Sequence, residues 1–330
     1  MERLSGAALA AYAGATRYEL LADRDDGTVV RCGDTVAKAH ARDSDPGALA
    51  VRIRVAGDAA LAGILLPPLR TGLGRVGGRA VSLWPYGAPV APDRPEEAPW
   101  EEAAELLAGL HRTPLHRLPA PLPPMRGPAK LARALRRLAA AHPPTAPAPA
   151  PARRGAADAE VDAEVDADAP ALARRVRSAA ATLPGWARGE GEQPPGGVLC
   201  HGDLHLGQLV RGPAGRWRLI DVDDLGLGAP SWDLARPAAW YAAGLLDTRT
   251  WLRFLDAYRA AGGPAAGPPG ADPWPELDVA ARALTVQTAA LALAKAAREE
   301  RRLDGGERLM VEACARIAAL PPDLEPSAPS

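Results

Sequence analysis

The segment from residue 198 to residue 224 limits most strongly what this chain can fold into. The apolar run Val198-Leu199-Cys200 predicts a short strand, and Asp203 follows it on the next loop. Further on, Gly212-Pro213-Ala214-Gly215 is a strong turn signal between two short β-like runs within 209–221. The segment therefore predicts a strand, a loop that carries a carboxylate, and an antiparallel hairpin.

This hairpin brings two polar side chains to the same level. Gln208 stands just before its first strand, and Asp221 ends its second strand. Neighbouring strands lie about 4.8 Å apart, so the amide oxygen and the carboxylate can converge on one cation. Phosphoryl transfer needs such oxygen ligands for magnesium, together with a carboxylate, here Asp203, that orients the attacking hydroxyl.

The first ninety residues predict a small β-rich region. Short β-like runs alternate with turn signals, and Asp45 followed by Pro46 predicts the start of a helix that stops at Gly57. A Pro85-Tyr86-Gly87 pivot closes the region. The predicted strands cover 16–23, 28–32, 34–40, 64–69 and 79–84, and the predicted helix runs to about 55.

Beyond Pro99 the pattern changes to helix, because apolar residues recur at steps of three and four. A Pro/Ala tract at 143–157 and an acidic repeat at 158–170 interrupt this pattern. The acids lack the glycine and the ligand spacing of a calcium loop, so 143–170 is expected to be a disordered surface insertion. The expected helices lie near 100–111, 130–142, 172–183, 248–261, 275–302 and 305–319.

Charge and cysteine content exclude several classes of protein. Lys and Arg number 39 against 40 Asp and Glu, which disfavours a protein that coats nucleic acid or an anionic membrane. The 3 cysteines lie far apart without CxxC spacing, so neither a disulfide framework nor a structural zinc site is expected. No apolar run approaches the ~20 residues of a membrane span. A soluble cytoplasmic protein is expected, and nothing in the sequence indicates its oligomeric state.

Three motifs give the chain a resemblance to a known family: HGDLHLGQ at 201–208, LIDVDD at 219–224 and SWDLA at 231–235. In this order and spacing they resemble the aminoglycoside phosphotransferase family of small-molecule kinases, and HGDLHLGQ is also similar to bacterial maltokinases. The resemblance implies an α+β, protein-kinase-like two-lobe fold with the active site between the lobes. It implies a small antiparallel β-rich nucleotide-binding lobe over 1–87 and a mainly helical catalytic and substrate lobe over 88–330.

The resemblance also implies roles for residues of these motifs. By this analogy Asp203 is the catalytic base, and Asp221 is the principal magnesium ligand. Gln208 stands where the family usually has a metal-binding Asn; its arm is one methylene longer, with the same amide oxygen. Asp233 supports the catalytic loop from the start of the next helix, and His201 is a scaffold residue.

In the small lobe the resemblance rests on fewer residues. Lys38, on the third predicted strand, fits the lysine that holds the nucleotide phosphates. Leu83 and Trp84 belong to the segment where the family's hinge presents backbone groups to an adenine or guanine ring. Two family features are missing: residues 46–57 contain no acid to pair with Lys38, and no GxGxxG loop precedes it.

The predicted reaction is transfer of the γ-phosphate of ATP, or of GTP, with Mg²⁺ to a hydroxyl of a small molecule. An aminoglycoside, a sugar or a related metabolite fits as acceptor. Basic and acidic residues are mixed along 282–308, which does not favour a site for a polycation. The missing acid and the missing glycine loop leave one alternative, a non-catalytic nucleotide-binding or scaffold protein.

Two local alternatives concern the acidic and histidine residues of the motifs. His201, Asp203 and His205 together suggest a zinc site, which is disfavoured because no further His/Cys cluster completes it. Asp223 and Asp224 suggest either a second metal ligand or a solvated turn, and the turn is the favoured interpretation.

Overall fold

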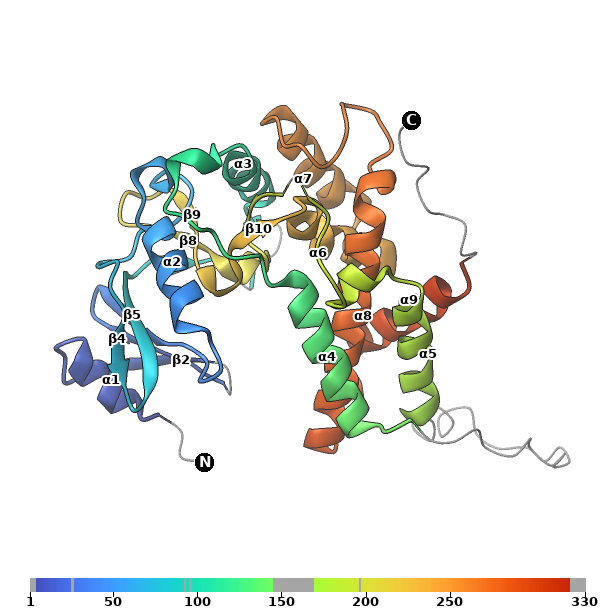
Figure 1. The fold of residues 1–330 in the computed structure, drawn as a ribbon, viewed down its shortest axis with the longest axis horizontal. Coiled ribbons are helices and arrows are strands. Elements are labelled where there is room, and N and C mark those ends of the chain that lie inside the picture. The colour runs from blue at the N-terminus through green and yellow to red at the C-terminus, as the bar shows by residue number, and fades with distance from the viewer. Residues whose placement is uncertain are drawn as a thin grey trace, which may run out of the picture. The chain divides into compact units, whose positions relative to one another are not determined.

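The computed structural model describes residues 4–24, 27–91, 93–94, 97–144, 169–195 and 197–320 (Figure 1). The chain groups into two compact units. The first comprises Met1–Arg126, Pro195–Asp233 and Leu252–Ala271, and the second comprises Gly127–Pro194, Leu234–Trp251 and Asp272–Ser330. Most of the predicted insertion at 143–170 lies outside the described residues. The division into lobes at residue 87 stays a prediction, because the first unit takes in later segments as well.

The first unit contains an antiparallel sheet with the strand order β1-β2-β3-β5-β4. Its central strands are rich in β-branched residues, and their side chains alternate between the two faces of the sheet. On β3, Ala37 and Ala39 face the core while Lys38 points to the opposite face. The strands are β1 (Glu19–Arg24), β2 (Gly27–Cys32), β3 (Thr35–Ala39), β4 (Gly74–Val76) and β5 (Arg79–Pro85).

The predicted strand at 64–69 is wrong. This stretch makes only an isolated bridge, between Leu65 and Leu219. Pro67 and Pro68 have no backbone N–H to donate, so the apolar run that suggested a strand cannot continue a ladder. The fourth strand is formed instead by β4, a three-residue strand that pairs with β5.

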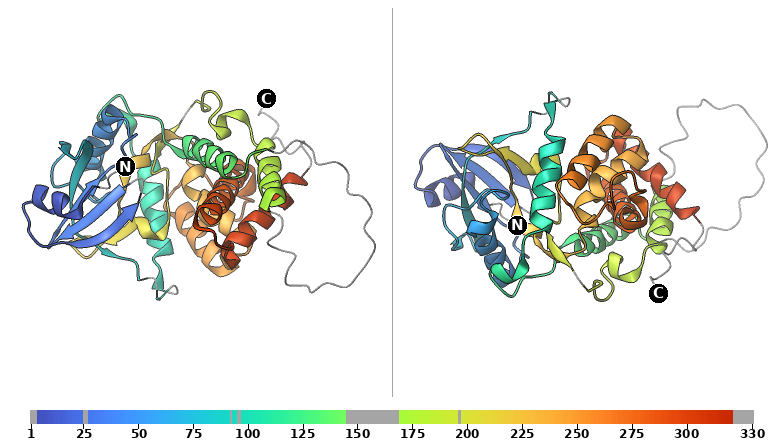
Figure 2. Two further views of the ribbon diagram at one scale, coloured as in Figure 1. Left: turned by 90° about the horizontal axis from the view of Figure 1, so that it is seen from below. Right: turned by 90° about the horizontal axis from the view of Figure 1, so that it is seen from above.

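Two helices accompany the sheet. The helix α1 (Gly6–Tyr12), which the sequence pattern did not predict, lies beside the sheet (Figure 2). It is capped by the Ser5 side chain and packs Leu9 among buried residues of β2, β3 and β5. The helix α2 (Pro46–Ala56) begins at the predicted N-cap, since the Asp45 carboxylate accepts the Ala48 N–H at 2.7 Å. It ends at Gly57, as predicted.

The predicted hairpin is present in the same unit. Strand β8 (Leu209–Arg211) pairs antiparallel with β9 (Trp217–Leu219), and β6 (Ala88–Pro89) extends this sheet on the other side of β8. Strand β7 (Val198–Cys200) pairs with β10 (Gly226–Gly228). The helix α3 (Trp100–His111) follows the predicted bounds and contacts both β7 and β9.

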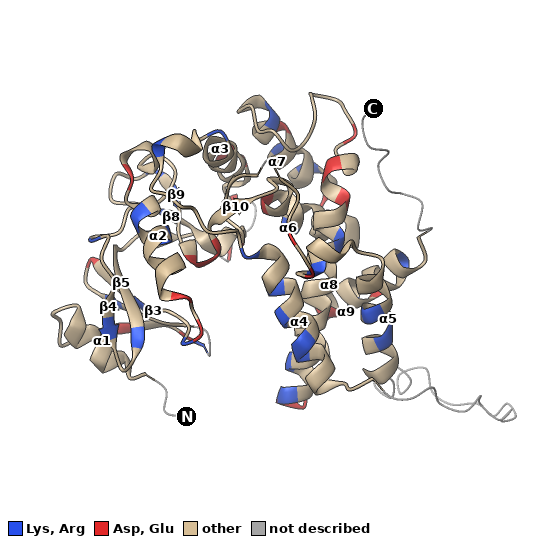
Figure 3. Ribbon diagram, viewed as in Figure 1, with Lys and Arg blue, Asp and Glu red and all other residues tan. Residues whose placement is uncertain are grey.

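The second unit is helical. Its helices pack around α8 (Trp274–Glu299), which contacts α4 (Gly127–Ala141), α5 (Ala169–Ala181) and α9 (Gly305–Ala318). Basic residues recur along α4 (Figure 3). Arg136 and Arg137 are exposed, as expected of a solvated face. Helices α6 (Ser231–Ala243) and α7 (Thr248–Ala260) contribute residues to both units.

Among the described helices, α8 alone is long and apolar enough to cross a membrane. However, 67 % of its most apolar window is buried inside the structure, which is the pattern of a core helix. The fold class predicted from the motifs is confirmed: an α+β fold with an antiparallel sheet in its N-terminal part and mainly helices in the remainder.

Candidate active site

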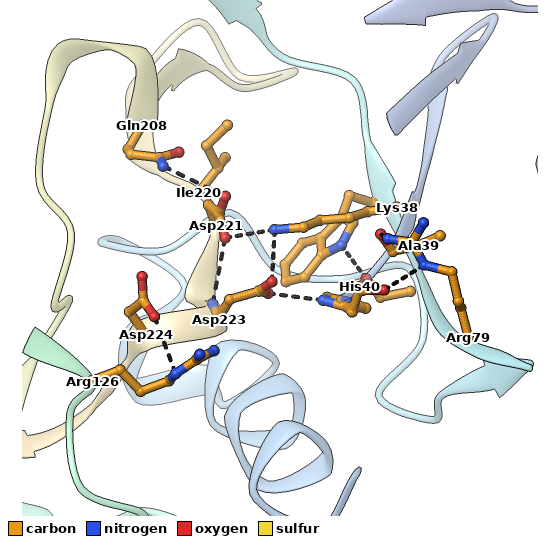
Figure 4. A network of polar contacts seen from close by, with 12 residues as sticks. Lys38, Ala39, His40, Arg79, Arg126, Gln208, Ile220, Asp221, Asp223 and Asp224 are labelled. Carbon is orange, nitrogen blue, oxygen red and sulfur yellow. Dashed lines mark hydrogen bonds and ion pairs between the residues drawn. The ribbon is translucent and has the colours of Figure 1, made fainter. Parts of the chain in front are cut away.

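Lys38 of β3 contacts two carboxylates that follow the hairpin. Its Nζ lies 2.6 Å from Asp221 Oδ1 and 3.1 Å from Asp223 Oδ2 (Figure 4). Burial by itself would lower the pKa of Lys38, but the two carboxylates outweigh burial and raise the pKa above its ordinary value. Lys38 is therefore a fixed cation whose side chain remains 13 % exposed.

Asp221 is held by backbone geometry as well as by Lys38. Its φ of 62° places it in the left-handed region, just after β9, and its side chain accepts the N–H of Asp223 at 3.4 Å. Such a conformation is uncommon outside glycine and typical of functional turns. The Asp221 side chain is 35 % exposed, more than any other member of this cluster for which an ion pair is formed.

Gln208 and Asp221 lie together, as the hairpin predicted. The Gln208 amide nitrogen is 3.5 Å from Asp221 Oδ2, and the Ile220 N–H donates to the Gln208 carbonyl at 2.9 Å. The Gln208 residue is 8 % exposed. A carboxylate oxygen next to an amide that can turn its own oxygen inward suits the hard oxygen coordination of Mg²⁺.

Asp223 is not part of a solvated turn, so the favoured interpretation of this residue is corrected. Its Oδ1 lies 2.9 Å from His40 Nδ1, while its Oδ2 faces Lys38. Burial would raise the pKa of Asp223, but Lys38 and His40 outweigh it and hold the pKa below its ordinary value. Asp224, the next residue, lies 3.6 Å from the Arg126 guanidinium.

Asp233 binds the backbone of the loop that carries Asp203. The fully buried carboxylate accepts the His201 N–H at 2.6 Å and the Gly202 N–H at 2.7 Å. It also lies 2.9 Å from His111 Nε2, whose other ring nitrogen is 2.7 Å from the Tyr258 hydroxyl. Three side chains in a row, Tyr258, His111 and Asp233, therefore fix the loop immediately ahead of Asp203. Asp203 itself is part-exposed.

His201 is built into the same loop. Its ring is buried, and Nε2 lies 2.7 Å from the Ile220 carbonyl oxygen, so Nε2 carries the proton and donates it. Among the described residues, Nδ1 has no hydrogen-bond partner. The ring links the loop to the strand end that precedes Asp221.

The zinc alternative has no support in the described residues. His205 Nδ1 accepts the Gly207 N–H at 3.1 Å, and His201 is occupied by Ile220. The group of possible metal ligands that the described chain brings together is His111, Cys200 and Asp233, which is buried and already paired.

A pocket of about 390 Å³ lies beside Lys38 in the first unit. Its volume is in the range of small-ligand sites. Lys38, Asp221 and Asp223 form its charged part. Its apolar part includes Leu21, Val29, Val36, Leu66, Trp84, Val210 and Ile220.

The two predicted hinge residues differ in position. Trp84 lines the pocket, whereas Leu83 lies in the core cluster of the sheet, and its carbonyl accepts the Leu69 N–H at 2.9 Å. Further along the segment, Tyr86 donates its N–H to the Asp34 carbonyl at 2.7 Å. Pro85 has no N–H, so neither residue can donate a backbone hydrogen bond to a base.

Sequence reasoning missed several residues that the structure brings to this site. His40 carried a signal, since it stands two residues after Lys38, directly past the end of β3, where an extended chain places both side chains on one face. His111 and Tyr258 carried none, because their contact joins residues separated by 147 positions.

The sequence profile of the phosphotransferase enzyme family matches residues 30–274. The chain belongs to this family. The match covers β3, the Asp203 loop, the Asp221 turn and Asp233, so the family predicted from the three motifs is confirmed. No curated protein sequence matches the chain.

Solved structures of small-molecule kinases share the fold of this family member. A choline/ethanolamine kinase family protein from Mesorhizobium loti is 18 % identical, with a TM-score of 0.54, over 95 % of this chain and 91 % of its own. A thermostable mutant of aminoglycoside phosphotransferase APH(4)-Ia is 13 % identical, with a TM-score of 0.59, over 95 % and 98 %. Spectinomycin phosphotransferase APH(9)-Ia, solved with ADP and spectinomycin, is 13 % identical, with a TM-score of 0.53, over 92 % and 91 %.

Proposed function

We propose that this phosphotransferase family member transfers the γ-phosphate of ATP, or of GTP, to a hydroxyl of a small molecule. The observation that carries the proposal is the contact of Lys38 with Asp221, beside Gln208 and at a pocket with an apolar part and a charged part. Phosphoryl transfer depends on positioning and charge neutralisation, and this cluster offers a fixed cation and oxygen ligands together.

The nucleotide is proposed to occupy the pocket with its base against Trp84 and the aliphatic side chains, and its phosphates toward Lys38. Pro85 and Tyr86 offer no free N–H, so apolar contact contributes more to base binding than hydrogen bonds from these two residues. That APH(9)-Ia was solved with ADP supports a nucleotide as donor for this fold.

Asp221 and Gln208 are the residues proposed to hold Mg²⁺ through their side-chain oxygens. When bound, the ion neutralises charge on the phosphate oxygens. Lys38 keeps a second positive charge at the phosphates. Asp203 is proposed to orient the acceptor hydroxyl and to take its proton while the acceptor oxygen bonds to phosphorus and the bond to the nucleoside diphosphate breaks.

The non-catalytic alternative rested on the missing helix acid and on the missing glycine loop, and the contacts of Lys38 argue against the first of these two reasons. Lys38 has carboxylate partners in Asp221 and Asp223 without an acid from α2. The loop residues ahead of Asp203 are also fully supported by Asp233.

The acceptor is proposed to be a hydroxylated compound that need not be a polycation. Two acids of the C-terminal helices are paired within the second unit, since Arg301 binds Glu299 at 3.1 Å and Glu307 at 2.7 Å. Paired carboxylates offer little net negative charge to a polyamine. Neutral sugars and amino sugars therefore belong in the first set of compounds to be assayed.

The test combines binding and product formation. Purified protein is titrated with Mg-ATP and Mg-GTP by calorimetry, and a panel of aminoglycosides, sugars and amino alcohols is assayed by nucleoside diphosphate release and by a mass shift of one phosphate. Asp203→Asn, which keeps the shape of the side chain, is expected to retain nucleotide binding and to lose transfer. The proposal is wrong if the wild type binds neither nucleotide and phosphorylates no compound.

A further inference from the structure

The helix α2 does not supply a partner for Lys38. It contains no acid, and its buried polar side chain is Arg52, which donates to the Leu225 carbonyl at 2.6 Å and to the Pro124 carbonyl at 3.1 Å. The helix thus binds the backbone next to the Asp221 turn. Lys38 needs another anchor, because Asp221 cannot serve Lys38 and a metal ion equally well with the same oxygen.

Asp223 has the geometry of that anchor. Each of its carboxylate oxygens faces a different cation or donor: Oδ2 lies 3.1 Å from Lys38 Nζ, and Oδ1 lies 2.9 Å from His40 Nδ1. The Asp223 side chain is 18 % exposed, about half the exposed fraction of Asp221. The two acids therefore differ. Both oxygens of Asp223 have a close partner, whereas Asp221 Oδ2 has, among the described residues, only Gln208 at 3.5 Å.

A chain of hydrogen bonds holds Asp223 from behind. Trp84 Nε1 can only donate, so the Ser82 hydroxyl accepts it at 2.8 Å. His40 Nε2 lies 2.7 Å from the same hydroxyl, which is able to donate to it. His40 Nδ1 faces a carboxylate and must carry the proton of that contact. The order Trp84, Ser82, His40, Asp223 directs every donor toward the carboxylate. Figure 4 shows the last of these contacts, between His40 and Asp223.

We propose that Asp223 is the positioning residue for Lys38, taking the place of the absent helix acid, with His40 and Ser82 as its support. The inference rests on the proposed function. When Asp221 engages Mg²⁺, Asp223 keeps Lys38 extended toward the phosphates. Asp223 acts through Lys38 and is not itself a metal ligand.

A double-mutant cycle tests this assignment. ADP affinity with Mg²⁺ is measured by calorimetry for the wild type, Lys38→Met, Asp223→Asn and the double variant. Losing a hydrogen bond to a charged group weakens binding by roughly tenfold or more, so each single variant is expected to lose about that factor. The double variant is expected to bind no more than about twofold more weakly than Lys38→Met, since both changes remove one interaction.

A Mg²⁺ titration distinguishes the positioning of Lys38 by Asp223 from direct coordination of the metal by Asp223. The Mg²⁺ concentration that gives half of the maximal ADP binding is expected to be unchanged in Asp223→Asn and raised in Asp221→Asn. A raised requirement in Asp223→Asn, or single effects that multiply in the double variant, would overturn the inference while the wild type still binds nucleotide. A wild type that binds no nucleotide would overturn the proposed function, and this inference with it.

A second pair of variants covers the case in which Asp223→Asn does not fold. His40→Asn keeps a donor near the position of Nδ1, whereas His40→Leu removes it. Affinity for ADP is expected to be close to wild type in His40→Asn and several-fold weaker in His40→Leu, at equal thermal stability. Equal ADP affinity in the two variants contradicts the support role.

Discussion

The Asp233 carboxylate accepts the Gly202 N–H at 2.7 Å, one residue before Asp203. The same buried group binds the His201 N–H and His111, so removing it leaves several buried donors unpaired. Asp233→Ala is expected to lower the free energy of unfolding by about 3 to 5 kcal/mol, measured by urea denaturation. Asp256→Ala, which removes a 69 % exposed acid, is the control and is expected to cost less than about 1 kcal/mol. Equal losses in the two variants would contradict this assignment.

Acid should weaken the fold through the same carboxylate. Burial would raise the pKa of Asp233, but the bond from His111 and its neighbours lower the pKa below its ordinary value. Because the pKa of Asp233 is lower in the folded protein than in the unfolded chain, its charged form stabilises the fold. This stabilisation is complete above the pKa of the unfolded chain, ~3.9, and disappears as the pH falls toward the pKa of the folded protein. The stability difference between the wild type and Asp233→Asn is expected to be constant from pH 7 to about pH 5 and to shrink below about pH 4. A difference that grows on acidification would show the opposite linkage.

Arg52 is expected to hold α2 to the Asp221 turn. Its guanidinium is buried and donates to two backbone carbonyls, so Arg52→Met leaves both acceptors unpaired. We expect a loss of about 1 to 3 kcal/mol in the free energy of unfolding. Arg54→Met, an exposed position on the same helix, is the matched control and is expected to stay within about 0.5 kcal/mol of the wild type. The measurement is chemical denaturation of both variants, and equal free energies of unfolding in the two would contradict the role given to Arg52.

Local signals predicted the parts of the site that are close in sequence. The turn residues at 212–215 and the flanking apolar runs were enough to place Gln208 beside Asp221, because a hairpin fixes its own register. Asp45 and Pro46 fixed the start of α2 for the same reason, since a cap acts within one turn. Apolar content alone was misleading at 64–69. The two prolines in this stretch have no backbone N–H to donate, so the predicted strand does not form.

Contacts between distant segments could not be read in this way. Lys38 and Asp221 are 183 positions apart, and they were brought together only by the resemblance to a kinase family. The absence of an acid from α2 was visible in the sequence, but the acid that replaces it lies after the hairpin, at Asp223. No helical or strand period connects these positions. Tertiary packing, rather than local preference, determines the partner of Lys38.

The role of Gln208 as a metal ligand can be tested by shortening its side chain and by removing its amide oxygen. Gln208→Asn keeps the amide oxygen but shortens the arm by one methylene, and Gln208→Leu removes the oxygen while preserving the size. Under the proposed function, the Mg²⁺ requirement for nucleotide binding is expected to rise modestly in the first variant and by tenfold or more, roughly, in the second. The measurement is ADP binding over a Mg²⁺ titration. Equal behaviour of Gln208→Leu and the wild type would remove Gln208 from the metal site.

Gly202 is expected not to tolerate a side chain, and Gly215 serves as the control that separates backbone strain from a steric clash. Gly202 and Gly215 both have positive φ values, 82° and 72°, so alanine strains the backbone at either position. A Cβ at Gly202 would also lie 2.5 Å from the Asp224 carbonyl oxygen, whereas a Cβ at Gly215 meets nothing within 4 Å. Gly215→Ala should therefore cost about 1 to 2 kcal/mol in the free energy of unfolding, and Gly202→Ala clearly more. Gly202→Ala is also expected to reduce phosphate transfer while Gly215→Ala leaves it near wild type, because only Gly202 adjoins Asp203. Equal destabilisation in the two variants would mean that the backbone at Asp224 moves aside at no cost.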